Sequence, residues 1–353
     1  MTIELRANPE YADLVALIRA LAANPEEDQL DVEWMIPGTL GVCRLPSSEA
    51  VIIFAGDELS SRSRIVSRHL HDRPIYRHGM TEPLSTTMLT LPSMPHFDQF
   101  AAFIVAELVR QDAEKDLGRA YRLSEPLIEL AFAQHTAALR TLYALAARVA
   151  LLAEIVDLSD DEALPRVVSA WCSDVPFRDL AAFGVGVVVR GADSSSPSIP
   201  INHVAEVSPA SGESSLLLLS VALTDSRTSG DFTLPDLVDR IFDRLRSAAP
   251  DHIEPLSTWL AGFRRSDAFE YRHDTAAADS FYGRAMSVDN SMAIDLMDPA
   301  LGALRQQNLE DYPAVVPGSV RYKLYNTGGI VTPSPRVGLE TVATAIAHAL
   351  RDS

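Results

Sequence analysis

The sequence has few cysteines and no recognisable export signal. Its two cysteines, Cys43 and Cys172, do not have the spacing of a metal-binding or redox motif. The first residues lack the basic-then-apolar order of a secretory signal peptide. We therefore expect a protein of the reducing cytoplasm.

A long uninterrupted apolar run is also missing. The longest apolar stretch, residues 127–156, is broken by five polar or charged side chains that would be costly inside a bilayer. This stretch predicts a buried helix of a globular protein, and we expect no membrane contact. The interrupting residues are Glu129, His135, Arg140, Arg148 and Glu154.

Basic residues are scarce, with 30 Lys and Arg against 48 Asp and Glu and a net charge of −18. Because Lys and Arg supply most non-specific affinity for phosphates, this balance opposes autonomous binding to long DNA. One segment is locally basic and is either a solvated surface or a contact for DNA or an acidic partner. Its two neighbouring histidines alone do not make a metal site. The segment contains Arg62, Arg64, Arg68, His69, His71, Arg73, Arg77 and His78.

Several common enzyme motifs are absent as well. The chain has no G-x-x-x-x-G-K-[ST] phosphate loop, no G-x-S-x-G elbow, no H-E-x-x-H pair and no paired C-x-x-C. The pair Gly184-x-Gly186 is followed by a β-branched run instead of the helix that a dinucleotide-binding turn requires. The major nucleotide-binding, hydrolase and zinc classes therefore lack their signatures.

The chain is long enough for two or three domains. Its 353 residues are 47% hydrophobic, which suffices for a sizeable core. In residues 1–120 a helix over 9–24 and a helix over 97–115 flank short apolar runs at 32–36, 40–45, 50–54 and 86–91, which are typical of antiparallel strands. We expect a β-rich N-terminal domain here.

The remainder alternates helices and strands. Ser124 is expected to cap a long helix that ends at Ile155. Strands are predicted over 183–190 and 214–223, and helices from Thr233 and over 338–351. We expect an α/β core over residues 121–250 and a C-terminal α/β extension over 251–353.

Five segments in this order carry a resemblance to a known family. They are Leu123-Ser-Glu-Pro-Leu-Ile-Glu-Leu-Ala-Phe, Trp171 followed by Arg178-Asp-Leu, Val188-Val-Arg, Phe232-Thr-Leu-Pro-Asp-Leu-Val-Asp-Arg-Ile, and Val320-Arg-Tyr-Lys-Leu. In these segments the chain resembles a family of bacterial PD-(D/E)XK-motif proteins found among restriction and phage-defence genes. The resemblance implies a restriction-endonuclease-like α/β (α+β) core, a mixed sheet flanked by helices.

The resemblance also implies a degenerate catalytic motif. Glu129 and Asp179 match the family's metal-binding acids, Val188 stands at the acidic position of the E-x-K strand, and Arg190 replaces its lysine. Valine cannot ligate Mg²⁺, and arginine is a poor proton acceptor. Without the resemblance, Glu129 reads as a helix-surface acid, Asp179 as a turn residue and Arg190 as a strand-end charge.

Three functions remain open. The first is a non-catalytic or partner-dependent nuclease-like subunit of a bacterial restriction or anti-phage defence system, without a cofactor and reaching DNA through partner subunits. The second is a divergent Mg²⁺-dependent endonuclease in which Glu206 or Asp193 supplies the missing carboxylate. The third is a structural protein–protein interaction subunit that does not contact nucleic acid.

Overall fold

The chain forms two compact units of mixed α/β structure, residues 1–138 and residues 139–353, and each is described by itself. The computed structural model describes residues 11–21, 30–45, 50–56, 58–75, 83–91, 97–173, 175–192, 198–225, 230–263, 269–279, 281–325 and 335–351. None of the helices in these ranges is both long enough and apolar enough to cross a bilayer.

The first unit contains a five-stranded antiparallel sheet with the order β1-β2-β3-β5-β4. The expected strands of this region are confirmed, because short apolar runs separated by turns fold back on one another. The strands are β1 (Glu33–Ile36), β2 (Leu40–Arg44), β3 (Ala50–Ala55), β4 (Leu70–Asp72) and β5 (Thr86–Thr90).

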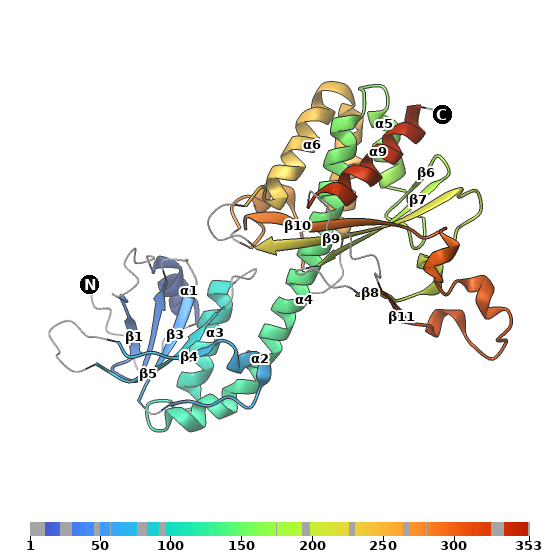
Figure 1. Ribbon diagram of the computed structural model, residues 1–353. Coiled ribbons are helices and arrows are strands. Elements are labelled where there is room, and N and C mark those ends of the chain that lie inside the picture. Colours follow the sequence, from blue (N-terminus) through green and yellow to red (C-terminus); the bar gives the residue numbers. More distant parts are fainter. Residues whose placement is uncertain are drawn as a thin grey trace. The chain divides into compact units, whose positions relative to one another are not determined.

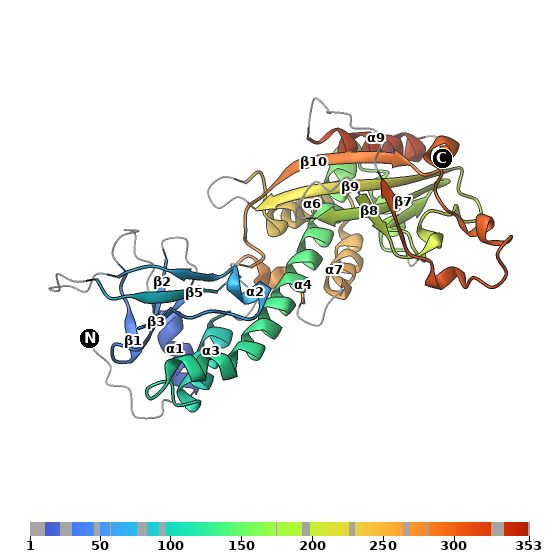
Figure 2. The same cartoon turned by 60° about the horizontal axis from the view of Figure 1, so that its bottom comes forward.

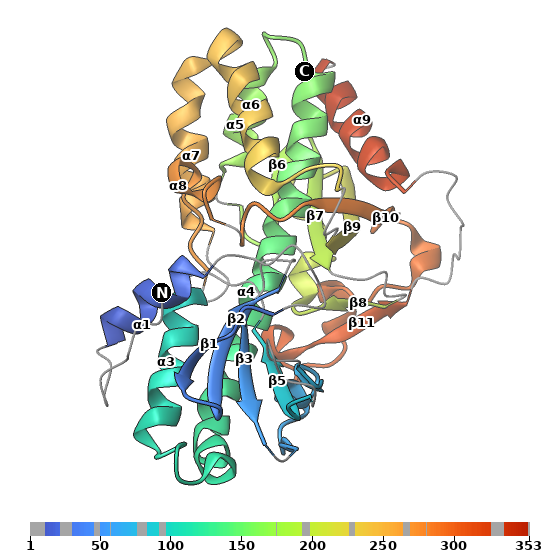
Figure 3. The same cartoon turned by 90° about the vertical axis from the view of Figure 1, so that its left-hand side faces the viewer.

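Helices cover one face of this sheet, where α1 and α3 lie side by side (Figure 3). Leu14 and Ile18 of α1 share a buried cluster with Ile52 and Phe54 of β3 and with Tyr121 of α4, whose ring meets that of Phe54 edge to face. The helices of the first unit are α1 (Tyr11–Ala20), α2 (Arg64–Ser67), α3 (Phe97–Arg110) and the first part of α4 (Leu117–Leu158).

The long helix α4 begins earlier than the sequence suggested. The expected cap, Ser124, lies inside the helix, where its hydroxyl donates to the carbonyl of Ala120 over 2.9 Å. Asp116 takes the capping position, because its carboxylate accepts from the backbone N–H of Arg119 over 2.8 Å. Pro126 is therefore an interior residue of α4.

The second unit is built on a four-stranded mixed sheet with the order β10-β9-β7-β6. Strands β6 (Leu180–Ala182) and β7 (Val185–Ala192) form a hairpin, β7 and β9 (Ser215–Asp225) are parallel, and β10 (Met286–Asp295) is antiparallel to β9. Phe183 and Gly184 turn the hairpin, both with positive φ as a two-residue turn requires. Gly184 thus belongs to a hairpin turn, and Gly186 is a residue of strand β7.

The two faces of this mixed sheet are covered differently. In Figure 1 the helices lie above the sheet, and the ribbon of β8 (Ser198–Ile201) and β11 (Tyr322–Tyr325) lies below it. Figure 2 shows helix α9 (Val337–Arg351) running along β10. Because β10 pairs with β9, the segments on either side of residue 250 share one sheet, so the expected boundary there does not separate two compact units.

Shorter elements complete the second unit. Helix α6 begins as the sequence predicted, since Thr233 and Asp236 form a reciprocal capping box. The other helices are α5 (Leu164–Trp171), α6 (Leu234–Ala248), α7 (Ile253–Gly262) and α8 (His273–Ala276), and short 3-10 turns lie at Val204–Glu206 (η1), Pro250–His252, Pro299–Leu301, Gln306–Leu309 and Pro317–Ser319.

Gly191 sets the approach of α4 to strand β7. A Cβ atom at this position would lie 2.2 Å from the carbonyl oxygen of Tyr143 and 2.7 Å from the Cβ of Ala147. We predict that Gly191→Ala lowers the free energy of unfolding by about 1–3 kcal/mol, because the helix must move away from the sheet.

Urea denaturation followed by circular dichroism measures this loss. Gly262→Ala is the matched control, since a Cβ there meets nothing within 4 Å and alanine favours the helix. Equal stabilities of the two variants would contradict the proposed close approach.

Candidate functional site

Asp179 lies immediately before β6 and is held on three sides. Its backbone N–H donates to the carbonyl of Val187 over 2.8 Å, and its Oδ2 accepts from the backbone N–H of Val189 over 2.7 Å. Its Oδ1 lies 2.5 Å from Nε of Arg148. Both carboxylate oxygens are therefore already engaged within the protein.

Arg148 is the residue of α4 that meets Asp179. Its side chain is 0% exposed, its Nη1 donates to the carbonyl of Ala144 over 2.7 Å, and its Cζ lies 5.2 Å from the ring centre of Phe263. Burial lowers the pKa of Arg148, and the charge of Asp179 opposes that shift. A buried guanidinium beside a carboxylate is stable only while both partners are present.

Sequence reasoning noted Arg148 only as an interruption of an apolar run. The signal that could have found its role was the charge itself, because a cation in the middle of an otherwise buried helix needs an anion nearby. Which anion it meets depends on the tertiary fold.

Arg190 and Glu206 form a second ion pair in the same unit. Nη2 of Arg190 lies 2.6 Å from Oε2 of Glu206, and the two side chains are only 17% and 11% exposed. Glu206 belongs to η1 and also accepts from the backbone N–H of Asn202. The carboxylate considered as a substitute ligand is thus bound to a guanidinium, and the other candidate, Asp193, lies outside the described residues.

Val188 faces an apolar cluster under the sheet. It is 1% exposed and packs with Ile199 and Ile201 of β8 and with Leu218 of β9, its partner in the parallel ladder. Side chains alternate along a strand, so Val188 and Arg190 point to this same face. A carboxylate at position 188 would enter a cluster of buried apolar side chains.

A third buried pair joins Arg178, the residue before Asp179, to Glu213. Arg178 Nε and Nη2 contact Oε1 and Oε2 of Glu213 over 2.7 and 2.8 Å, and Nη2 also donates to the carbonyl of Ser208. Burial by itself raises the pKa of Glu213, but the bonds from Arg178 and from the backbone N–H of Ala210 outweigh it and hold that pKa below the ordinary value.

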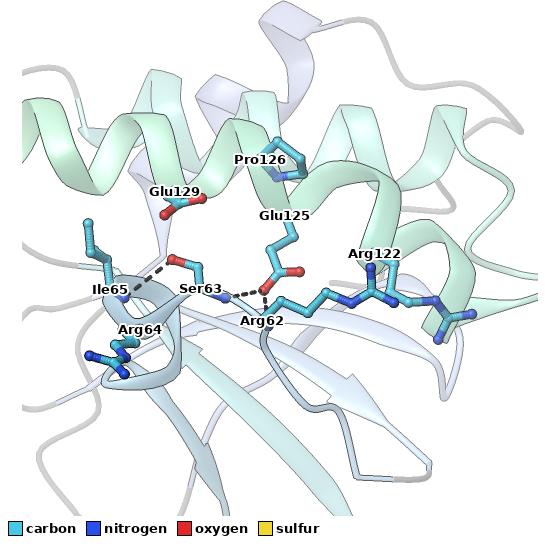
Figure 4. Close-up of a pocket in the computed structure, with 8 residues that line it drawn as sticks. All are labelled: Arg62, Ser63, Arg64, Ile65, Arg122, Glu125, Pro126 and Glu129. Carbon is cyan, nitrogen blue, oxygen red and sulfur yellow. Dashed lines mark hydrogen bonds between the residues drawn. The ribbon is translucent and has the colours of Figure 1, made fainter.

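Glu129 belongs to the first unit, where it lines a cleft of about 490 Å³ between α4 and the turn that begins α2. Figure 4 shows Glu129 on the face of α4 that meets this turn. Arg62 and Arg64, predicted from the basic segment, line the same cleft. Arg122, which sequence reasoning did not select, joins them from α4.

The rest of the basic segment is dispersed. Arg68 is exposed at the end of α2, and the backbone N–H of Arg73 donates to the carbonyl of Thr86 beyond β4. His69 stacks on Phe132 with ring centres 4.6 Å apart, and His71 is exposed on β4. Arg77 and His78 lie outside the described residues, which hold no cluster of three or more His, Cys, Asp or Glu suited to a metal ion.

No family model, curated protein or solved structure matches the chain. Its function is therefore inferred from its own residues and their geometry.

Removing the charge of Arg148 should destabilise the second unit strongly. We predict that Arg148→Met lowers the free energy of unfolding by about 3–5 kcal/mol, because Asp179 loses its partner in a largely buried position. Adding Asp179→Asn should recover part of the loss, since asparagine is neutral and can still accept from Val189. Denaturant unfolding of the single and double variants measures this coupling.

Arg240→Met is the matched control for that cycle. Arg240 pairs with Asp157, but the two side chains are 49% and 35% exposed, so the expected loss is below about 1 kcal/mol. Similar losses for Arg148→Met and Arg240→Met would contradict the structural role of the buried pair.

The Arg178–Glu213 pair predicts an acid-sensitive contribution to stability. Since the folded state lowers the pKa of Glu213, its stabilisation is present above the unfolded-state pKa and is lost as pH falls through the folded-state pKa. Glu213→Gln should therefore be less stable than wild type at neutral pH, with the difference shrinking in acid. Unfolding curves from about pH 7 down to about pH 3 test this, and a gap that widens in acid would refute it.

Proposed function

We propose that this protein is a nuclease-shaped but non-catalytic subunit of a bacterial DNA restriction or anti-phage defence system. The family resemblance of the sequence suggests the core, and a mixed sheet with helices on one face is compatible with it. Within the sheet, Asp179 lies against the strand that carries Val188 and Arg190. The protein then contributes by binding, together with partner subunits that cut or modify DNA.

The main support for a non-catalytic role is that a buried guanidinium, that of Arg148, already neutralises Asp179. A nuclease of this class needs several oxygen ligands around one hard divalent cation. Here Arg148 supplies the positive charge next to Asp179. Glu206 is paired with Arg190, and the side chain at position 188 is apolar and buried. The described residues of the second unit therefore do not fit a Mg²⁺ ion, and we derive no metal-dependent step.

This arrangement also weighs against the divergent-nuclease alternative. For Glu206 to join a metal site, it would have to leave Arg190, whose Nε already has no hydrogen-bond partner although it is buried. That exchange would leave the guanidinium of Arg190 without its carboxylate partner in a largely buried position.

A structural interaction subunit is a second candidate for the same chain. Leu123, Leu127 and Leu130 of α4 are 49%, 37% and 57% exposed and follow helical spacing along one side of α4. Such an exposed apolar stripe favours a protein partner, whether or not DNA is also bound.

We predict that the purified full-length protein does not cut supercoiled or linear DNA in Mg²⁺ or Mn²⁺. The restored motif, Val188→Glu with Arg190→Lys, should lose stability instead of gaining activity, because the new carboxylate is buried among apolar side chains. Agarose-gel cleavage assays and denaturant unfolding give the two readouts.

Asp225→Asn with Arg284→Lys serves as the control double variant, since it alters an ion pair at the end of β9, away from the motif positions. Metal-dependent cleavage by the wild-type protein that disappears in Asp179→Asn, with the variant still folded, would overturn the non-catalytic proposal.

A further inference from the structure

The cleft of the first unit combines three arginines with two glutamates, the buried Glu125 and the exposed Glu129. Its cationic side chains come from two places: Arg62 and Arg64 flank Ser63 at the start of α2, and Arg122 projects from α4 (Figure 4). Within the described part of the chain these three guanidinium groups make no hydrogen bond or ion pair. By contrast, arginines such as Arg110 and Arg178 each bind a carboxylate.

The backbone that carries Arg62 and Arg64 is fixed. Glu125 of α4 is only 6% exposed, and its Oε1 accepts from the backbone N–H of Arg62 over 2.7 Å, from that of Ser63 over 3.1 Å and from the Ser61 hydroxyl. Ser63 in turn accepts from the first N–H groups of α2. The side chains of Arg62 and Arg64 therefore extend from a backbone that is hydrogen-bonded to α4. In an ordinary solvent-exposed run of charged residues, the backbone would not be fixed in this way.

The cationic surface continues beyond the cleft. Arg68 lies one turn after Arg64, and Arg119 lies one turn before Arg122; both are exposed and, within the described chain, unpaired through their side chains. Five arginines thus lie in two short stretches of chain, residues 62–68 and 119–122, both of which reach the cleft, in a chain whose net charge is −18. Such a local track attracts an extended anion more effectively than a single small one.

Glu129 restricts the chemistry of that anion. Its exposed carboxylate lines the cleft and has no hydrogen-bond partner among the described residues, so it would repel a ligand that offers only phosphate oxygens there. A ligand with both a phosphate and a nearby hydroxyl or amino donor satisfies the arginines and the glutamate together. A nucleotide unit has this combination in its phosphate and its sugar or base.

We propose that this cleft binds a nucleic-acid strand, with Arg62, Arg64 and Arg122 on phosphate oxygens and Glu129 accepting from a sugar hydroxyl or a base amino group. The inference rests on the proposed function, a role in a system that acts on DNA. It adds that this protein itself contacts nucleic acid, in addition to any contact made by its partners. It needs no catalytic step in the second unit.

The test is binding of fluorescently labelled 20-nucleotide DNA and RNA strands and duplexes to the full-length protein over a salt series. The triple variant R62Q/R64Q/R122Q should bind at least about tenfold more weakly and show a log–log salt slope that is smaller by about 2, as expected for the loss of three phosphate contacts. Glu129→Gln should bind inorganic phosphate more tightly, because the repelling carboxylate is gone. Its affinities for strands of different sugar or base composition should differ less than those of the wild-type protein.

The matched control, R19Q/R110Q/K115Q, removes the same charge from the first unit outside the cleft. It should bind like wild type, and circular dichroism should show all variants folded. Equal weakening by both triple variants, or no wild-type binding at low salt, would overturn the proposal.

Competition with ATP and inorganic phosphate separates the possible sources of the phosphate group. If a single nucleotide displaces a strand at equal concentration, the cleft is a nucleotide site and the strand proposal is wrong. A failure of strand binding would leave the non-catalytic proposal for the second unit intact, since cleavage assays and the stability of the Arg148 variants test that proposal separately.

Discussion

The ion pair between Arg148 and Asp179 is the constraint on which the second unit depends. It joins α4 to the hairpin of β6 and β7, because Asp179 also accepts from the backbone of Val189. A fully buried guanidinium cannot tolerate the loss of its anion, so helix and hairpin keep a fixed relation. Gly191 permits the same close approach from the strand side.

Charge balance distinguishes the two units chemically. In the second unit, three arginines are matched to Asp179, Glu206 and Glu213, and these carboxylates have little capacity left for an external cation. In the first unit, the arginines that line the cleft with Glu129 make no ion pair within the described ranges, so their donors remain available. In the function that we propose, recognition belongs to the first unit and the ion pairs of the second unit contribute structural stability.

The sequence predicted those features that are encoded locally. Short apolar runs between turn residues located four of the antiparallel strands of the first unit, and Thr233 with Asp236 located the start of α6. It misplaced the start of α4, since Ser124 and Pro126 resemble a helix cap but the backbone remains helical through them. The partner of Arg148 lies 31 residues away in the sequence. Arg122 lines a cleft together with residues about sixty positions earlier. Neither arrangement could be predicted from local spacing.

The apolar surroundings of Val188 have an evolutionary consequence. An acid at that position would need polar neighbours on β8 and β9 and a different partner for Arg190, and each change made alone would destabilise the core. Under the proposed function, a metal-binding form of this core therefore lies several individually unfavourable substitutions away from the present sequence.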